Sequence, residues 1–364
     1  MMRRTLIFAF AAATLLLPML ANALEGDHRI FPAKGSETGR LLIHGATDLD
    51  AMQPLIADFQ DRNPDIAVEY TDMVTNDLFR QAQQICAAKA EGADILLSSS
   101  VDQLVRLAND GCAQPHRSAE TMAVPDWANW RDEVFGFTFE PVVFVYDRRT
   151  VPAEDVPRSH EALSNLLRSK AEAYRGRVGT YDIAASGVGY LLAFNDSRQA
   201  PTANGRLLET LSRTDTVIRC CNNEVLGELA AGRISLAYNV LGSYAYAAAR
   251  ANAALGIVLP RDYTLILSRG ALIPSHAPHP DVGKRFLNYL LSARGRGVAR
   301  EKSFFFAEDA PLPDGVDGPP DLMQSGIGRP IRIGPALLAA QDEVQRRTFI
   351  ADWMELIRKS RTDR

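Results

Sequence analysis

The chain has 364 residues, of which 46% are hydrophobic and 23% charged, and its formal net charge at pH 7 is −4. It has no run of basic residues that would neutralise a phosphate backbone, so a nucleic-acid partner is not expected. One hydrophobic core rarely serves a chain beyond about 250–300 residues, so we expect two globular lobes.

The N-terminus has the pattern of a secretory signal peptide. Met1–Arg4 is short and basic, Leu6–Leu20 is apolar, and Ala21-Asn22-Ala23 supplies the small residues for cleavage after Ala23. An uncleaved membrane anchor is the alternative, but such a span takes roughly 20 apolar residues. Removing residues 1–23 deletes two arginines and no acidic residue, which changes the net charge from −4 to −6. We therefore expect a periplasmic protein.

Beyond the signal peptide, short apolar strands alternate with amphipathic helices. The pattern predicts strands at residues 41–43, 66–70 and 93–97, with a helix after each of them. Ser100 and Gln103 have the spacing of a capping box at the start of the third helix. This rhythm predicts an α/β fold with a largely parallel sheet covered by helices.

The pattern changes near residue 140, where Pro141 interrupts a β-rich run and predicts that the chain leaves the first lobe. A second α/β rhythm follows, and residues 255–273 form a matching return run. We predict two α/β lobes joined by a hinge with two chain crossings. Residues 24–139 plus 261–364 would form lobe 1, and residues 140–260 would form lobe 2.

The chain has four cysteines, Cys86, Cys112, Cys220 and Cys221. Export to an oxidising compartment permits disulfides, and four cysteines allow three complete pairings. Cys86 and Cys112 are placed so that they could close a small crosslink. The adjacent Cys220 and Cys221 lack the spacing of redox or zinc motifs, which favours a structural role and leaves metal or redox chemistry as the alternative.

Polar and glycine-containing loops follow several predicted strands. Ligands of open α/β sheets bind beyond the carboxyl ends of strands, where free backbone amides favour an anion. The serines and threonines there could instead only cap their own helices. The candidate ligand-binding residues are Thr47, Ser98, Ser99, Ser100, Glu140, Tyr181, Asp182, Ser186, Gly187, Val188, Asn239, Ser243 and Tyr244.

Catalytic motifs are weak by comparison. The sequence has no G-x-S-x-G elbow and no H-E-x-x-H metal site. A secreted hydrolase that uses Ser186 or Glu140 is the enzyme alternative. We expect no enzyme activity, no cofactor and no resident metal.

Several segments resemble the periplasmic substrate-binding proteins of ABC importers, in the class II group that includes ferric-ion-binding and phosphosugar-binding members. They are Ala93–Ser99, Gly179–Asp182 with Ser186–Gly189, Tyr238–Tyr244, and Phe286–Ser292 with Gly295. The resemblance implies the type II periplasmic-binding-protein fold, a monomer, and an inner-membrane ABC permease as partner. It also implies a small anionic organic ligand, such as a sugar phosphate or a carboxylate, bound by hinge closure.

The resemblance leaves two alternatives open. One is a ligand-sensing accessory of a membrane histidine kinase. The other is ferric-ion transport, in which the family presents two adjacent tyrosines as phenolate ligands. Here Ala245 separates Tyr244 from Tyr246, so that pattern is broken.

Overall fold

The first of two β-sheets carries the N-terminal part of the chain. The computed structural model describes residues 27–304 and 306–358, so the predicted signal peptide lies outside the described residues. The strand order is β1 (Asp27–Phe31), β3 (Ile66–Asp72), β2 (Gly39–Ala46), β4 (Ile95–Ser98), β13 (Gly270–Leu272), β6 (Val134–Gly136) and β5 (Asn129–Trp130). Strands β3, β2 and β4 are parallel as predicted, whereas β1, β13, β6 and β5 pair antiparallel and make the sheet mixed.

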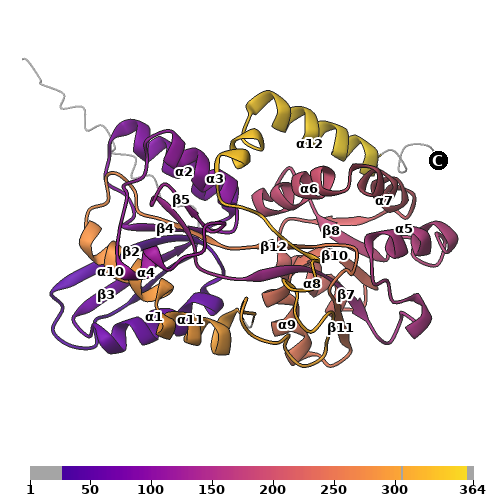
Figure 1. The fold of residues 1–364 in the computed structure, drawn as a ribbon, viewed down its shortest axis with the longest axis horizontal. Coiled ribbons are helices and arrows are strands. Elements are labelled where there is room, and N and C mark those ends of the chain that lie inside the picture. The colour runs from indigo at the N-terminus through magenta and orange to yellow at the C-terminus, as the bar shows by residue number, and fades with distance from the viewer. Residues whose placement is uncertain (1–26, 305, 359–364) are drawn as a thin grey trace, which may run out of the picture.

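The second sheet is also mixed and lies beside the first (Figure 1). Its order is β14 (Val316–Asp317), β11 (Leu255–Val258), β7 (Glu140–Asp147), β10 (Leu236–Leu241), β8 (Val178–Tyr181) and β9 (Val217–Arg219). Strand β12 (Thr264–Leu267) pairs with the start of β7 and with β15 (Gly328–Pro330). Below, the first half means the first sheet with its helices, and the second half means the second sheet with its helices.

Helices surround both sheets. Those of the first half are α1 (Leu49–Arg62), α2 (Thr75–Ala88), α3 (Val101–Asn109), α4 (Ala119–Met122), α10 (Pro280–Leu291), α11 (Ala293–Val298) and the π-helix η2 (Ala299–Ser303). Those of the second half are η1 (Ala153–Asp155), α5 (His160–Ser169), α6 (Gly187–Gln199), α7 (Pro201–Arg213), α8 (Asn222–Ala230), α9 (Gly242–Ala251) and α12 (Glu343–Arg358). The short helix η3 (Pro335–Ala339) packs against α3 of the first half. Among the described residues, no helix is both long and apolar enough to cross a membrane.

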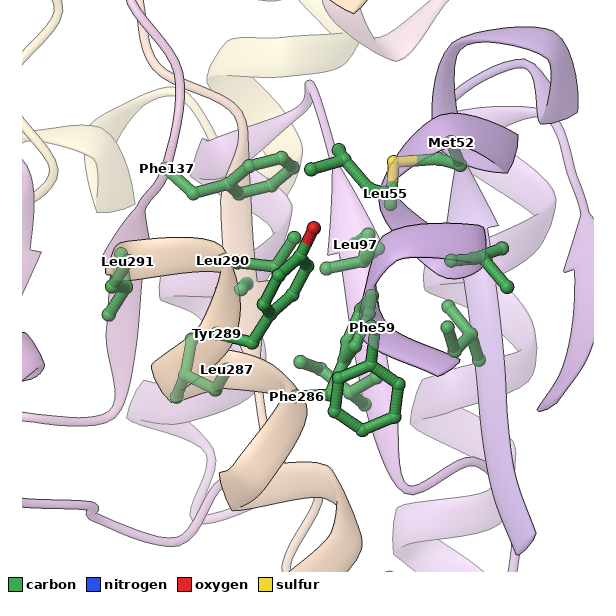
Figure 2. Close-up of a cluster of buried hydrophobic side chains, with 14 of the residues drawn as sticks. Met52, Leu55, Phe59, Leu97, Phe137, Phe286, Leu287, Tyr289, Leu290 and Leu291 are labelled. Atoms are coloured by element: carbon green, nitrogen blue, oxygen red, sulfur yellow. The ribbon is translucent and has the colours of Figure 1, made fainter. Parts of the chain in front are cut away.

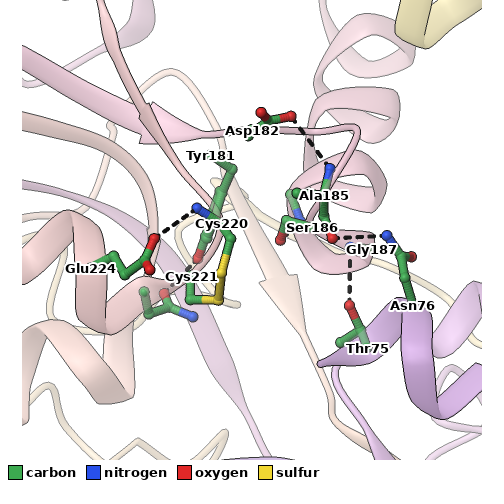
Figure 3. The surroundings of a disulfide bond; sticks show 12 residues. Thr75, Asn76, Tyr181, Asp182, Ala185, Ser186, Gly187, Cys220, Cys221 and Glu224 are labelled. Atoms are coloured by element: carbon green, nitrogen blue, oxygen red, sulfur yellow. Dashed lines mark hydrogen bonds between the residues drawn. A yellow bond between two sulfur atoms is a disulfide. The ribbon is translucent and has the colours of Figure 1, made fainter. Parts of the chain in front are cut away.

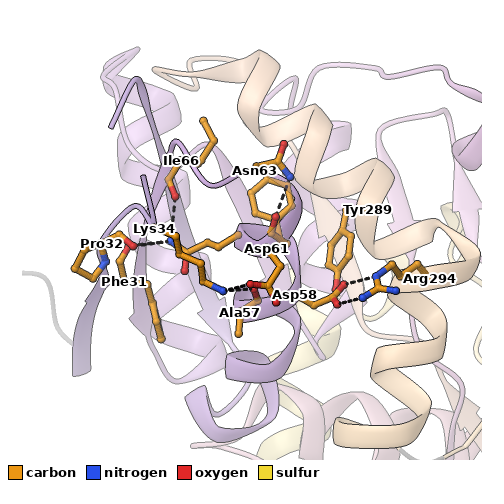
Figure 4. Close-up of polar contacts among 12 residues, drawn as sticks. Phe31, Pro32, Lys34, Ala57, Asp58, Asp61, Asn63, Ile66, Tyr289 and Arg294 are labelled. Carbon is orange, nitrogen blue, oxygen red and sulfur yellow. Dashed lines mark hydrogen bonds and ion pairs between the residues drawn. The ribbon is translucent and has the colours of Figure 1, made fainter. Parts of the chain in front are cut away.

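The first core joins segments far apart in the sequence. Phe59 of α1 packs edge-to-face on Phe286 of α10, with ring centroids 5.0 Å apart, and both side chains are fully buried (Figure 2). At the surface of the same contact, Asp58 accepts hydrogen bonds from Tyr289 and Arg294 at 2.9 and 3.0 Å (Figure 4). The segment that contains α10 and α11 therefore completes the first half, although β7 to β12 precede it in the chain.

The chain passes between the sheets three times, and the first two connections are short. Residues 137–139 lead from β6 to β7, and residues 268–269 lead from β12 back to β13. After η2 the chain returns to the second sheet through β14 and β15, and α12 covers α6 and α7 (Figure 1). The predicted lobe boundaries at residues 140 and 260 stay a proposal. The return places β14, β15 and α12 with the second half, whereas the segment between β15 and α12 also contacts the first half, where Ile333 donates to the Trp127 carbonyl and Gln341 donates to Asp102.

One predicted crosslink and one predicted cap can be checked directly. Cys86 of α2 forms a disulfide with Cys112 after α3, which confirms that pairing. The prediction of a capping box formed by Ser100 and Gln103 is wrong. The Ser100 side chain makes no cap hydrogen bond, and the Gln103 side chain donates to Asn76 Oδ1 of α2 at 2.8 Å.

Candidate functional site

A cavity of about 290 Å³ lies where the two halves meet. Its first wall comes from β1, from the loops after β2, β3 and β4, and from the start of α2, and its second wall comes from the starts of α6, α8 and α9. The lining residues are Asp27, Ala46, Asp48, Asp72, Met73, Val74, Thr75, Ser99, Ser186, Val188, Cys220, Cys221, Asn222, Asn223, Tyr244 and Arg269. The volume is near the lower end of the ~300–1,000 Å³ range of small-molecule pockets, so the site fits a small solute.

A second, larger cavity of about 440 Å³ lies between residues 137–139 and the helices α11 and η2. None of the residues predicted to bind a ligand lines it. The cavity between the two walls is therefore the one that the sequence pattern points to.

The base of the cavity is a buried ion pair. Arg269, in the segment that returns to the first sheet, donates from Nε to Glu140 Oε1 at 2.6 Å and from Nη1 to Thr47 Oγ1 at 2.9 Å. Burial disfavours the charged guanidinium, but Glu140 outweighs this effect and raises the pKa of Arg269. The guanidinium also stacks against Tyr244 and Phe304, with its carbon 5.1 and 5.0 Å from the ring centroids. Arg269 lies in the short connection 268–269 and Glu140 directly follows the connection 137–139, so the ion pair joins these two connections.

The first wall is acidic. Asp48 immediately precedes α1, Asp72 ends β3, and Asp27 begins β1. Burial, together with the neighbouring carboxylates Asp48 and Asp27, raises the pKa of Asp72 to about 7, and a hydrogen bond from the Leu49 N–H only partly offsets the rise. Burial and Asp48 also raise the pKa of Tyr244, whereas Arg269 lowers it.

The second wall is rich in hydrogen-bond donors. Cys220 and Cys221 form a disulfide between adjacent residues at the start of α8, and the Cys220 N–H donates to Glu224 at 3.1 Å (Figure 3). The first N–H groups of α8 have no acceptor within the helix, as at any helix start. Asn222 accepts hydrogen bonds on Oδ1 from Tyr181 and from the Leu241 N–H, which leaves its Nδ2 for the cavity.

The two walls touch above the cavity. The Gly187 N–H donates to Thr75 Oγ1 at 3.0 Å, and Asn76 Nδ2 donates to the Ala185 carbonyl at 2.8 Å (Figure 3). Behind these contacts α3 packs against Val188 and Leu191 of α6 in one apolar cluster. In this structure the two halves are therefore in contact beside the cavity.

Four of the residues predicted to bind a ligand line the cavity: Ser99, Ser186, Val188 and Tyr244. They come from three separate loops, and the fold brings these loops together. Ser186 also accepts a hydrogen bond from the Gly189 N–H at 3.0 Å, so the helix-capping alternative holds for it as well.

The remaining predicted residues lie outside the cavity lining, and each has a structural partner. Thr47 and Glu140 accept hydrogen bonds from the Arg269 guanidinium, and Ser243 donates to Glu140. Ser98 accepts from the Ser100 N–H, and Ser100 is buried against Gly187. Tyr181 bonds to Asn222, Asp182 accepts from the Ala184 N–H, the Gly187 N–H is taken by Thr75, and Asn239 donates to Asp196.

The sequence analysis missed most of the charged lining. Asp48 precedes α1, Asp72 ends β3, and neither is among the predicted ligand-binding residues. Arg269 lies within the predicted return run 255–273, where no local motif marks it. A structural role is predicted for the adjacent cysteines Cys220 and Cys221, although both line the cavity.

The alternative chemistries find little support here. In the part of the chain that the structure describes, no histidine or carboxylate is hydrogen-bonded to Ser186, and Glu140 is fully buried against Arg269. Tyr246 packs on Phe306, with ring centroids 6.2 Å apart, whereas Tyr244 faces the cavity. The two phenols therefore do not converge on one metal position.

Comparison with known proteins agrees with this architecture. The family model described as bacterial extracellular solute-binding protein matches residues 42–305. The substrate-binding protein of an ABC transporter from Agrobacterium tumefaciens is 32% identical, with a TM-score of 0.84 over 92% of this chain and 100% of that chain. No curated protein matches by sequence.

Two more distant structures share the fold. Iron-bound HitA from Pseudomonas aeruginosa is 17% identical, and AfuA from Actinobacillus pleuropneumoniae, solved with fructose-6-phosphate, is 14% identical. Each has a TM-score of 0.67, and each match covers 88% of this chain and 99% of the other. The family match and the Agrobacterium relative go further than fold, and the chain belongs to the bacterial extracellular solute-binding proteins.

Proposed function

We propose that this protein is the periplasmic solute-binding component of an ABC importer and that it captures one small polar solute in the 290 Å³ cavity. The observation that carries the proposal is that both halves of the molecule contribute polar groups to this one cavity, among them Ser99 from the first half and Asn222 from the second. The name of the Agrobacterium relative, a substrate-binding protein of an ABC transporter, supports the assignment to transport.

The proposed mechanism is closure of the two halves about the segments 137–139 and 268–269. A solute that contacts both walls is bound better when they touch, so it favours the form with the Thr75–Gly187 and Asn76–Ala185 contacts. The permease would recognise the surface that this form presents. A sensor kinase would use the same cleft, and it remains the alternative partner.

The ligand classes suggested by the sequence are not equally compatible with the cavity. Ferric ion is disfavoured because Tyr246 packs away from Tyr244. An anionic group has one suitable place, at the start of α8, because the lining arginine is already paired with Glu140. In the described part of the chain no histidine or carboxylate is hydrogen-bonded to Ser186, which supports binding without chemical change.

A thermal-shift screen tests the function. Residues 24–364 are purified, unfolded and refolded to remove any copurified solute, and then mixed with sugar phosphates, carboxylates, amino compounds and ferric citrate. A solute at 100 times its Kd stabilises the native state by about 2.7 kcal/mol, which raises Tm measurably. Small-angle scattering should show a smaller radius of gyration with the same solute. Turnover of the bound solute, or an unchanged radius of gyration on saturation, would contradict the proposal.

A further inference from the structure

The cavity lining has an excess of negative charge on one wall. Asp27, Asp48 and Asp72 face it, and Arg269 is the single basic residue among the described residues that line it. Glu140, which is fully buried, already matches the charge of that arginine through two hydrogen bonds of 2.6 and 3.1 Å. A solute with only negative charge would bring a further anion next to the three carboxylates.

The opposite wall has the reverse character. Asn222 and Asn223 begin α8, where unpaired N–H groups and the helix dipole favour an anion. The Asn222 residue is only 8% exposed, and its Nδ2 has no partner within residues 27–304 and 306–358. The residue lines the cavity, so this amide is available to an acceptor on the solute.

The first wall offers a second polar group to the cavity. Ser99 lines the cavity, is 3% exposed, and its hydroxyl has no partner in the described part of the chain. Two polar side chains on opposite walls, both more than nine-tenths buried, therefore face the same small space. Together they show that the space is built for a polar guest that spans it.

From this arrangement we infer that the solute is a small zwitterion, with its ammonium group against Asp48 and Asp72 and its anionic group at the start of α8. The inference rests on the proposed function and names its substrate class. An ammonium group neutralises the acidic wall, and a carboxylate or phosphonate accepts from the Asn222 amide and the first N–H groups of α8. Because each charge meets its complement, neither is buried without a partner.

Two matched sets of probes test the inference on the refolded chain of residues 24–364. One set is β-alanine, propionate and propylamine, and the other is 2-aminoethylphosphonate, ethylphosphonate and ethylamine. Isothermal titration calorimetry should detect a zwitterion from at least one set, and each of its single-charge analogues should bind at least thirtyfold more weakly, the scale of losing one partner of a buried charge pair.

Variants test which wall holds which charge. Asp48→Asn and Asp72→Asn should each weaken the zwitterion by roughly thirtyfold or more and leave the anionic analogue unchanged or bound more tightly. The matched control is Asp50→Asn, because Asp50 is exposed in the first turn of α1 and does not line the cavity. Circular dichroism and Tm of each variant confirm that it folds.

The outcomes separate the inference from the proposed function. Tighter binding of a sugar phosphate, a simple carboxylate or ferric citrate than of either zwitterion would overturn the zwitterion and leave a solute-binding protein. Equal binding of the zwitterion by wild type and both aspartate variants would overturn the assignment of the acidic wall. Failure of both zwitterions to bind also overturns the inference, whatever else the protein binds.

Discussion

The backbone N–H of Gly187 donates to the side-chain oxygen Oγ1 of Thr75 at 3.0 Å, and this hydrogen bond joins the two halves of the molecule. Thr75 begins α2 beside the first sheet, and Gly187 begins α6 beside the second. The Gly187 N–H, which the sequence analysis predicted to bind a ligand, therefore joins the two halves beside the cavity instead. Its neighbour Ser186 remains in the lining.

Gly187→Ala should weaken solute binding, because the halves approach too closely there for a side chain. A Cβ at this position would lie 2.5 Å from Ser100 Oγ and 2.8 Å from Thr75 Oγ1. Overpacking of this kind costs about 1–3 kcal/mol. Because the proposed binding mechanism needs the halves in contact, affinity should fall about five- to 140-fold. Isothermal titration calorimetry measures the change.

The matched control is Gly205→Ala in α7, where a Cβ would meet nothing within 4 Å. That variant should keep its affinity and gain stability, since alanine favours a helix by about 1 kcal/mol over glycine. Equal affinities for the Gly187 and Gly205 variants would contradict a role of this contact in binding.

The two disulfides should have separable effects. Cys86–Cys112 joins residues 26 apart in the sequence, and a loop of that size contributes about 3–4 kcal/mol to stability in the chain-entropy description. Cys220–Cys221 closes no loop, but it lines the cavity at the start of α8. The double variant Cys220→Ser/Cys221→Ser should therefore lose affinity for the solute with little change in Tm. The double variant Cys86→Ser/Cys112→Ser should instead lower Tm with little change in affinity. A common effect of both double variants on affinity would show that the adjacent pair has no special place in the site.

The elements with a strong local pattern were predictable from the sequence. Phe59 and its neighbours on α1 repeat at helical spacing, and the serines after β4 mark the end of a buried strand. Ser99 and Tyr244 could be predicted to face the site because they follow strands in a parallel arrangement. In each case the information lies within about ten residues of the chain.

Arg269 and Asp72 show what such a pattern cannot reveal. Arg269 reaches the cavity because β12 ends beside β7, which places it against Glu140, 129 residues earlier in the chain. Asp72 becomes important only because β1 and the start of α1 bring two more carboxylates to it. The place of α12 was equally hidden, since an amphipathic pattern defines an apolar face but not its partner.

Glu140→Ala should destabilise the protein strongly. The substitution leaves the Arg269 guanidinium buried without its carboxylate, and removing one partner of a buried ion pair costs about 3–5 kcal/mol. Urea unfolding measures the loss. The control Glu209→Ala removes an exposed pair with Arg213 on α7, and it should change stability by no more than about 0.5 kcal/mol. Similar losses for the two variants would mean that the ion pair at the base of the cavity does not hold the two crossings together.

The raised pKa of Asp72 predicts how stability and binding respond to pH. An aspartate in the unfolded chain titrates near 3.9, whereas burial and the nearby carboxylates raise the pKa of Asp72 in the fold to about 7. Between these values the folded state holds a proton that the unfolded state has lost, so Asp72 makes stability fall as pH rises from about 4 to 7. Asp72→Asn removes this ionisation and keeps an acceptor for the Leu49 N–H.

The variant should therefore match wild type near pH 4 and be the more stable protein at pH 7.5, as measured by urea unfolding at both values. Asp352→Asn, at an exposed position on α12, is the control and should have the same stability as wild type at both pH values.

A cationic group bound beside Asp72 favours the carboxylate, so zwitterion binding at pH 6.5 should release a proton. Calorimetry in two buffers of different ionisation enthalpy detects that release as a difference in the observed heat. An equal heat in both buffers would show that Asp72 does not meet the cationic end of the solute, even if the variant is stabilised as expected.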